Sequence, residues 1–190
     1  MNQRIFFAIQ ISPQIKEQLA SFQYRWLNLP IRWVAKENFH ITLLFLGQKK
    51  IEEIARISEL IHQVAHRHSS FFLTFKQVQL QPNANRPTTF WIRGEENSVF
   101  SKLVQDLETS LKTERLYFST GSSAKKQVPH ITLGRVRRWQ WSQLELEERP
   151  EIEETFSLKI PVKKITLVES KLRRRGPEYI TLETAVLDSK

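Results

Sequence analysis

The chain has 190 residues, of which 40% are hydrophobic and 26% charged, a composition typical of one globular domain or two small lobes with a sizeable core. It has no cysteine, which excludes disulfides and cysteine-based zinc or redox chemistry, and no apolar run reaches the roughly 18–20 residues of a membrane span. A formal net charge of +9 favours a polyanionic partner such as RNA or DNA, although many basic proteins bind neither.

The first half of the chain predicts strands alternating with helices. The start, Asn2-Gln3-Arg4, lacks the architecture of a secretory signal, so we expect a cytoplasmic protein. A near-continuous apolar run at residues 4–11 is typical of a buried strand, and Ser12 followed by Pro13 is a favourable start for a helix. We then expect strands at 31–34 and 38–47, a helix at 51–64, and strands at 71–80 and 88–93.

The second half repeats this order. After the strand at 88–93 we expect a helix at 98–111, a strand at 128–136, a short acidic helix at 139–148, and strands at 156–160 and 179–186. The order strand, helix, strand, helix, strand therefore occurs twice. It predicts a single α+β domain, residues 1–190, of two similar lobes (approximately 4–85 and 88–187) that are related by an approximate two-fold axis and can exchange strands.

Both halves contain the sequence His-Ile-Thr-Leu, at residues 40–43 and 130–133. Each copy lies in a run rich in β-branched and aromatic residues that favours a strand, so histidine and threonine share one face and isoleucine and leucine face the core. One copy alone is most simply a half-exposed polar face. The duplication indicates a function, because packing does not require the same histidine and threonine twice. If the two strands face each other, they form an acid–base site from His40, Thr42, His130 and Thr132.

Two histidines suit proton transfer because their unperturbed pKa near 6.5 lets one be neutral while the other is charged. The hydroxyl groups of Thr42 and Thr132 would stabilise negative charge between them. The motif is nearly symmetric and does not decide which histidine is the acid. A second histidine pattern, His62 and His66, has the spacing of a helical zinc pair, but Gln63 stands where a metalloprotease needs glutamate, so we expect no metal site.

These residues resemble the two-histidine (2H) phosphoesterases, which carry one H-x-T-x motif in each lobe, and in particular the LigT-like RNA 2′,3′-cyclic phosphodiesterases. The resemblance spans essentially the whole chain. It is carried by residues 4–9, 32–34, 37–43, 45–47, 129–135 and 176–179. The chain departs from it at Leu44, where many relatives carry arginine.

The resemblance implies a bilobal fold, two lobes of antiparallel sheet with outer helices and a central cleft that needs no metal or other cofactor. It implies hydrolysis of a 2′,3′-cyclic phosphate at an RNA end to a 2′-phosphate, with His40 as proton donor and His130 as proton acceptor. Members were first described as 2′–5′ RNA ligases, so this reverse-type reaction is also an expectation. We expect a monomer whose partner is such an RNA, with no membrane. The alternative is a catalytically silent module that binds RNA ends, although such a module would not need both His-Thr pairs.

Further substrate contacts are expected from Arg135 and three aromatic residues. Arg135 stands three positions after Thr132, so a regular strand would turn it to the opposite face unless Gly134 marks a bulge. Trp33, Phe39 and Tyr179 could stack on a terminal base. For Trp33 and Phe39 a place in the core is an equal alternative. The basic run Lys171, Arg173, Arg174 and Arg175 is expected at a hairpin tip, where it is either solvated or in contact with RNA phosphates.

Overall fold

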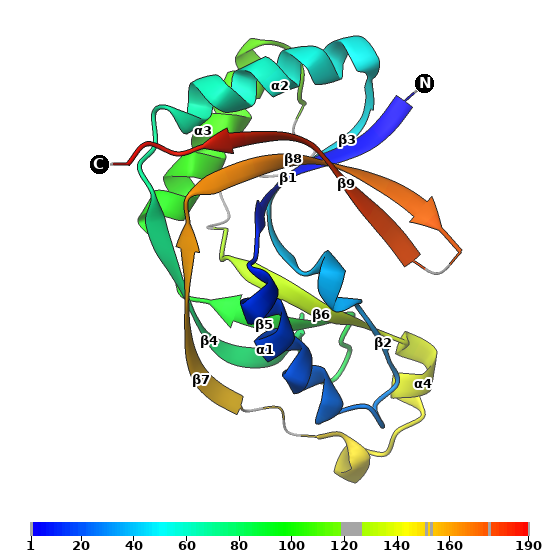
Figure 1. The fold of residues 1–190 in the computed structure, drawn as a ribbon. Coiled ribbons are helices and arrows are strands. Elements are labelled where there is room, and N and C mark those ends of the chain that lie inside the picture. Colours follow the sequence, from blue (N-terminus) through cyan, green and yellow to red (C-terminus); the bar gives the residue numbers. More distant parts are fainter. Residues whose placement is uncertain (1, 119–126, 151, 153, 175, 190) are drawn as a thin grey trace.

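The computed structural model describes residues 2–118, 127–150, 152, 154–174 and 176–189, and Arg175 lies outside these ranges. The helices and strands follow in the order shown in Figure 1: β1 (Asn2–Gln10), α1 (Pro13–Tyr24), β2 (Ile31–Trp33), η1 (Lys36–Asn38), β3 (His40–Lys50), α2 (Ile51–Ala65), β4 (Phe71–Gln81), β5 (Thr89–Gly94), α3 (Ser98–Thr113), β6 (His130–Val136), α4 (Arg138–Ser142), η2 (Leu146–Glu148), β7 (Glu154–Val162), β8 (Lys164–Arg173) and β9 (Gly176–Val186).

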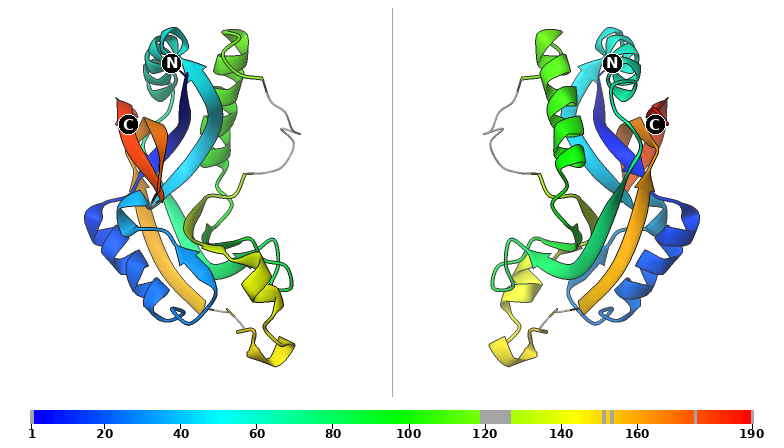
Figure 2. Two further views of the ribbon diagram at one scale, coloured as in Figure 1. Left: turned by 90° about the vertical axis from the view of Figure 1, so that its right-hand side faces the viewer. Right: turned by 90° about the vertical axis from the view of Figure 1, so that its left-hand side faces the viewer.

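The strands form one antiparallel sheet that curls into a half-barrel. Its order is β7-β4-β5-β6-β3-β1-β8-β9, and β2 pairs with the end of β6, at Gly134–Val136. The sheet has two halves, which meet where β3 pairs with β6 through Ile41 and Ile131. Both chain termini lie in the half built from β1, β3, β8 and β9, and α4 lies at the opposite end of the molecule (Figure 1, Figure 2). The expected α+β class is confirmed.

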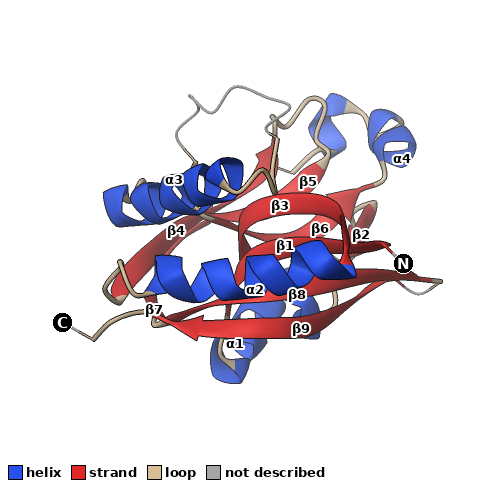
Figure 3. Cartoon of the chain, turned by 90° about the horizontal axis from the view of Figure 1, so that it is seen from above, coloured by secondary structure: helices blue, strands red, loops and turns tan. Residues whose placement is uncertain are grey.

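The helices cover the face of the sheet that carries the hydrophobic core. Helix α2 packs against α3 and against β3, β8 and β9 (Figure 3), and α1 packs against β6 and η1. Leu19 of α1, Ile61 of α2 and Leu107 of α3 are fully buried in one continuous core. The opposite face carries a small separate cluster of Phe6, Ala8 and Val168. This second face is therefore free to carry a cleft. Among the described residues no helix is long and apolar enough to cross a membrane.

Two elements differ from the expectations. Strand β8 was not predicted, although Ile165, Leu167 and Val168 are buried and the strand pairs with both β1 and β9. The helix expected at 139–148 is wrong in extent, because α4 ends at Ser142 and only a short 3₁₀ turn follows. The guanidinium of Arg149 donates to the carbonyl oxygen of Leu144, at 3.2 Å from Nε and 3.1 Å from Nη2. It therefore supplies hydrogen bonds to a backbone carbonyl just beyond the end of α4.

The topology regroups the strands of the two sequence repeats. Strand β4, from the first half of the chain, lies between β5 and β7, whereas β8 and β9 from the second half lie beside β1. The half of the sheet with β1, β3, β8 and β9 is thus assembled from the two ends of the chain, and the half with β4, β5, β6 and β7 from its middle. The division into repeats at 4–85 and 88–187 stays a prediction.

Candidate active site

The two His-Ile-Thr-Leu motifs lie side by side in the sheet. Ile41 of β3 is paired with Ile131 of β6, and the strands run antiparallel. Ile41 and Ile131 are fully buried on the core face, so the histidine and threonine on either side of each point to the opposite face. His40, Thr42, His130 and Thr132 all line one cavity of about 370 Å³.

Each motif ends in a β-bulge. Phe7 of β1 is paired with Leu44 of β3, and Ala8 is paired with Thr42, so Leu43 is the extra residue in β3. In β6 the extra residue is Leu133, which lies between the partners of Phe90 and Trp91.

The bulged carbonyl of Leu133 is held by two donors. It accepts from the backbone amide of Val34 at 2.9 Å and from Nε2 of Gln23 at 2.9 Å. Gly134 also lets β2 approach closely, because a Cβ there would lie 3.0 Å from Cε3 of Trp33 and would clash with Cγ2 of Ile31.

The bulges turn two further side chains onto the cleft face. Without them, the residue three positions beyond each threonine would face the core. With them, Phe45 lies on the side of Thr42 and Arg135 on the side of Thr132, and both line the cavity. The bulge considered beside Gly134 is therefore present. Phe45 was not predicted from the sequence as a site residue. Its position five residues after His40, which matches that of Arg135 after His130, could have indicated it.

Both histidine rings are tethered in the same way. Nδ1 of His40 lies 2.7 Å from the carbonyl oxygen of Asn38, and Nδ1 of His130 lies 3.2 Å from that of Val128. A carbonyl can only accept, so Nδ1 carries the hydrogen in each ring. This leaves Nε2 of each histidine as the atom that can gain or lose a proton.

Thr42 and Asn38 position the ring of His40. Nε2 of His40 lies 3.1 Å from Oγ1 of Thr42. The hydroxyl donates to Nε2 when the ring is neutral, and it accepts from Nε2 when the ring is charged. The side-chain amide of Asn38 donates to the carbonyl of Pro177 at 2.9 Å, so one residue ties His40 to the start of β9.

Burial lowers the pKa of both histidines. The pKa of His40 falls to about 4, chiefly because the ring is buried, and the charges of Lys16 and His130 lower it further while the Asn38 carbonyl opposes the change. Burial also lowers the pKa of His130, against the opposing effect of the Val128 carbonyl. Both rings are therefore neutral at pH 7 in the free protein.

Aromatic side chains bury these rings. Tyr179 stands edge-on to His40 with centroids 5.1 Å apart, and Phe6 lies 5.0 Å from the same ring. The indole of Trp91 stacks on His130 with a centroid distance of 3.7 Å and an interplanar angle of 17°. Trp91 could not be selected from the sequence, because its contact with His130 depends on the pairing of β5 with β6.

The charged side chains that line the cleft are all positive among the described residues. Arg32 and Arg135 lie on its wall, and no carboxylate is among its described lining residues. Burial raises the pKa of the Tyr179 hydroxyl, so this group is neutral at physiological pH. A cleft with two imidazoles, two threonine hydroxyls and two guanidiniums can bind an anion and exchange protons with it.

Of the aromatic residues expected to touch the substrate, two lie at the cleft. Trp33 and Tyr179 line the cavity. Phe39 does not: it is 1% exposed and belongs to the hydrophobic core, so the prediction that it contacts a base is wrong. The strand position just before His40 faces inward, which sequence alternation alone predicts.

The remaining histidines lie away from the cleft, around the end of α2. His62 contacts Glu183 at 3.2 Å, His66 contacts Asp188 at 3.5 Å, and Nε2 of His68 lies 2.9 Å from Asp106. Each pairs with a carboxylate from another element. No group of three or more potential metal-binding side chains is found in the part of the chain that the structure describes.

Comparison with known proteins gives a consistent result. The family model described as LigT-like phosphoesterase matches residues 9–91 and 100–179. A Methanocaldococcus jannaschii protein is 31% identical over 184 residues, covering 93% of this chain and 96% of its own. A Thermotoga maritima protein is 29% identical over 184 residues, covering 94% and 92%. Both relatives are named RNA 2′,3′-cyclic phosphodiesterase.

Two solved structures share the fold. A Thermus thermophilus protein superposes with a TM-score of 0.82 at 26% identity, covering 98% of this chain and 99% of its own. The Escherichia coli LigT protein, crystallised with 3′-AMP, superposes with a TM-score of 0.79 at 24% identity over the whole of both chains. The second likeness establishes the fold alone.

Proposed function

The chain belongs to the LigT-like phosphoesterase family, and from this premise we propose that it hydrolyses the 2′,3′-cyclic phosphate at an RNA end to a 2′-phosphate. It is a cyclic phosphodiesterase, as its relatives at about 30% identity are named. The observation that carries the finer proposal is the pair of identically tethered histidines, His40 and His130, on one small cavity.

The two Nε2 atoms act on opposite sides of the phosphorus. His130 takes a proton from a water molecule, whose oxygen attacks the phosphorus in line with the P–O3′ bond. That bond breaks, and His40 gives its Nε2 proton to O3′. The product carries a 2′-phosphate and a free 3′-hydroxyl. The family resemblance assigns the two roles, and each proton transfer contributes ~10²–10⁴ in rate.

Fixed donors stabilise the charge that develops on the phosphoryl oxygens. The hydroxyls of Thr42 and Thr132 and the guanidinium of Arg135 face the cavity in which this charge would lie. Arg135 offers a planar pair of N–H donors that matches two oxygens of one phosphate. The bulge at Leu133 makes this possible, because it brings Arg135 to the same face as Thr132.

Substrate binding supplies the charge state that the reaction needs. The productive form has His40 charged and His130 neutral, whereas in the free enzyme both are neutral at pH 7. A phosphodiester carries one negative charge, which raises the pKa of a nearby imidazole. Protonation of His40 is thus coupled to occupation of the cleft by an anion.

The charge of the chain favours an RNA over a free mononucleotide. The net charge is +9, and Arg32 extends the positive wall of the cleft beside Arg135. Phosphates upstream of the cyclic end would gain from this field, so affinity for RNA should fall as salt rises. We extend the proposal to the reverse-type reaction, in which a 5′-hydroxyl replaces water and a 2′–5′ bond forms.

The test is turnover of an RNA oligonucleotide that ends in a 2′,3′-cyclic phosphate, measured in EDTA, with the product identified by ³¹P NMR. His40→Ala and His130→Ala should each lower kcat/KM by ~10²–10⁴. His66→Ala is the matched control, because His66 is an exposed histidine at the C-terminal end of α2 that does not line the cleft, and the change should leave kcat/KM unchanged. Undiminished turnover in either cleft variant would refute paired-histidine catalysis. Tight RNA binding without turnover in the wild type would favour the silent module.

A further inference from the structure

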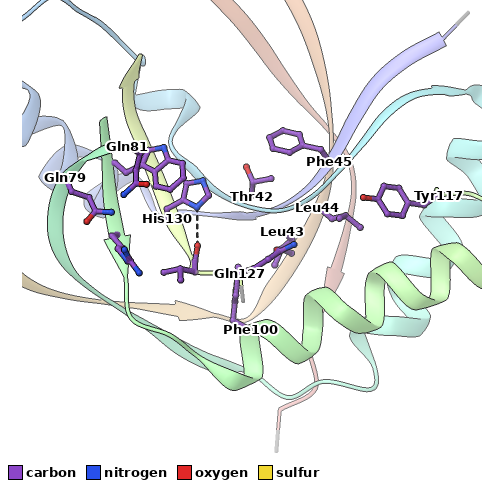
Figure 4. Close-up of a pocket in the computed structure, with 13 residues that line it drawn as sticks. Thr42, Leu43, Leu44, Phe45, Gln79, Gln81, Phe100, Tyr117, Gln127 and His130 are labelled. Carbon is purple, nitrogen blue, oxygen red and sulfur yellow. Dashed lines mark hydrogen bonds between the residues drawn. The ribbon is translucent and has the colours of Figure 1, made fainter. Parts of the chain in front are cut away.

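A second, larger cavity adjoins the first beside His130. It has a volume of about 680 Å³, within the range of small-molecule sites. It shares Thr42, Phe45, Trp91 and His130 with the catalytic cavity, so the two are continuous. Figure 4 shows Gln79 and Gln81 on one side of His130 and Leu44 and Tyr117 on the other.

The floor of this cavity is the polar face of β4 and β5. Gln79 is paired across the strands with Trp91, and Trp91 is paired with Thr132 of the second motif. Arg93 is paired with His130 itself. Paired residues of antiparallel strands point to the same face, so a polar surface extends from the catalytic motif across two further strands.

Two donors on this floor have no partner among the residues that the structure describes. Nε2 of Gln79 and Nε1 of Trp91 are buried and make no hydrogen bond to any described residue. Buried donors are nearly always paired, and these two belong to directly opposed residues. Both residues line the cavity, so a ligand bound there could supply the acceptors that these donors lack.

The rest of the lining fits a nucleoside. Leu44, Phe100 and Tyr117 form an apolar wall opposite the glutamines, and no carboxylate lines the cavity among the described residues. The aromatic ring of Phe45, which is 67% exposed, stands where the two cavities join. A base presents apolar faces and an edge rich in acceptors, which is the complement of such a wall and floor.

The in-line geometry of the reaction distinguishes the nucleoside that keeps the phosphate from a second nucleoside on the side of the attacking oxygen. The attacking and leaving oxygens lie on opposite sides of the phosphorus, so the ribose that keeps the phosphate approaches from the side of His40. A separate cavity of about 530 Å³ lies there, lined by His40 and Tyr179 and not by His130. The larger cavity is lined by His130 and not by His40, and it therefore opens on the side of the nucleophile.

We propose that the glutamine-lined cavity is the binding site for a second nucleoside, whose 5′-hydroxyl takes the place of water. His130 removes the 5′-hydroxyl proton, the O5′–P bond forms, the P–O3′ bond breaks, and O3′ takes the proton of His40. The product is a 2′–5′ phosphodiester, and the reverse steps cleave one. This inference rests on the proposed function, of which it assigns the acceptor subsite.

The experiment compares two substrates, of which only one carries a second nucleoside. One is adenosine 2′,3′-cyclic phosphate, and the other is the 2′–5′ dinucleotide of adenosine. Gln79→Leu and Gln81→Leu should lower kcat/KM for the dinucleotide by about tenfold, because the edge of the second base loses a partner. Both should leave kcat/KM for the cyclic mononucleotide within about twofold. Gln105→Leu, on the exposed face of α3, is the matched control and should change neither.

Several results would overturn the subsite. Equal losses on both substrates, in variants that unfold at the wild-type temperature, would place the glutamines in the handling of the cyclic phosphate itself. A loss confined to the cyclic mononucleotide would place the terminal base in this cavity. A wild-type enzyme that hydrolyses the cyclic phosphate but never cleaves the dinucleotide would overturn the subsite and leave the proposed function standing. Failure to hydrolyse the cyclic phosphate would overturn both.

Discussion

The low pKa of His40 predicts an unusual pH dependence for this enzyme. A catalytic acid must be protonated in the productive form, yet burial lowers the pKa of His40 from 6.5 to about 4. At pH 6.5 only about one free enzyme molecule in 300 then carries this proton. The pKa of His130 is also lowered, so both groups that govern kcat/KM titrate below 6.5.

The profile of kcat/KM should therefore be bell-shaped with a maximum between about pH 4 and 6.5, because this parameter reports the free enzyme. The profile of kcat should peak at higher pH, because the bound phosphate raises the pKa of His40. Steady-state rates with adenosine 2′,3′-cyclic phosphate, measured at constant ionic strength across pH 4–9, give both profiles.

Lys16 offers a way to move this optimum without touching the reacting groups. Its charge is one of the causes that lower the pKa of His40. Lys16→Gln should therefore shift the maximum of kcat/KM upward by a fraction of a pH unit. A wild-type maximum above pH 7, or coincident profiles of kcat and kcat/KM, would refute the argument that burial keeps both imidazoles neutral.

Three further predictions follow from the same geometry. The folded His40 titrates near 4 and an unfolded histidine near 6.5, so protons favour the unfolded chain. The free energy of unfolding is therefore unaffected by His40 above pH 6.5 and falls by roughly 3 kcal/mol between pH 6.5 and about 4. Urea unfolding should show this fall in the wild type and not in His40→Gln. Arg135→Met should lower kcat by ~10²–10³, whereas Arg137→Met, two residues further along the chain, should leave it nearly unchanged; equal effects would remove Arg135 from the site. Gly134→Ala should destabilise the fold by ~1–3 kcal/mol, because the new Cβ meets Ile31, and an unchanged midpoint of thermal unfolding would contradict the close packing of β2 on β6.

The sequence indicated the face of each catalytic strand before any pairing was known. Alternation along a strand is local, so Ile41 and Ile131 had to face the core if His40 and His130 faced a cleft. The same alternation should have excluded Phe39, which neighbours His40 and is buried. Composition added the expectation of an anionic partner.

Strand pairing supplied what the sequence left open. The stacking of Trp91 on His130 depends on the register of β5 with β6, and the cleft depends on the contact of β3 with β6, between residues far apart in the chain. The bulge that turns Arg135 to the cleft was open to inference only because Gly134 follows the motif. Strand β8 was not predicted, although its run of Ile165 to Val168 favours a strand, because the internal repeat did not indicate a strand there.

By itself the sequence determined the chemical identity of the reacting groups and the face on which each one lies, since both follow from residue type and from the geometry of an extended backbone. Tertiary structure decided their protonation. The pKa of His40 depends on how deeply Phe6, Tyr179 and the neighbouring strands bury its ring, and desolvation is a property of everything packed around a group.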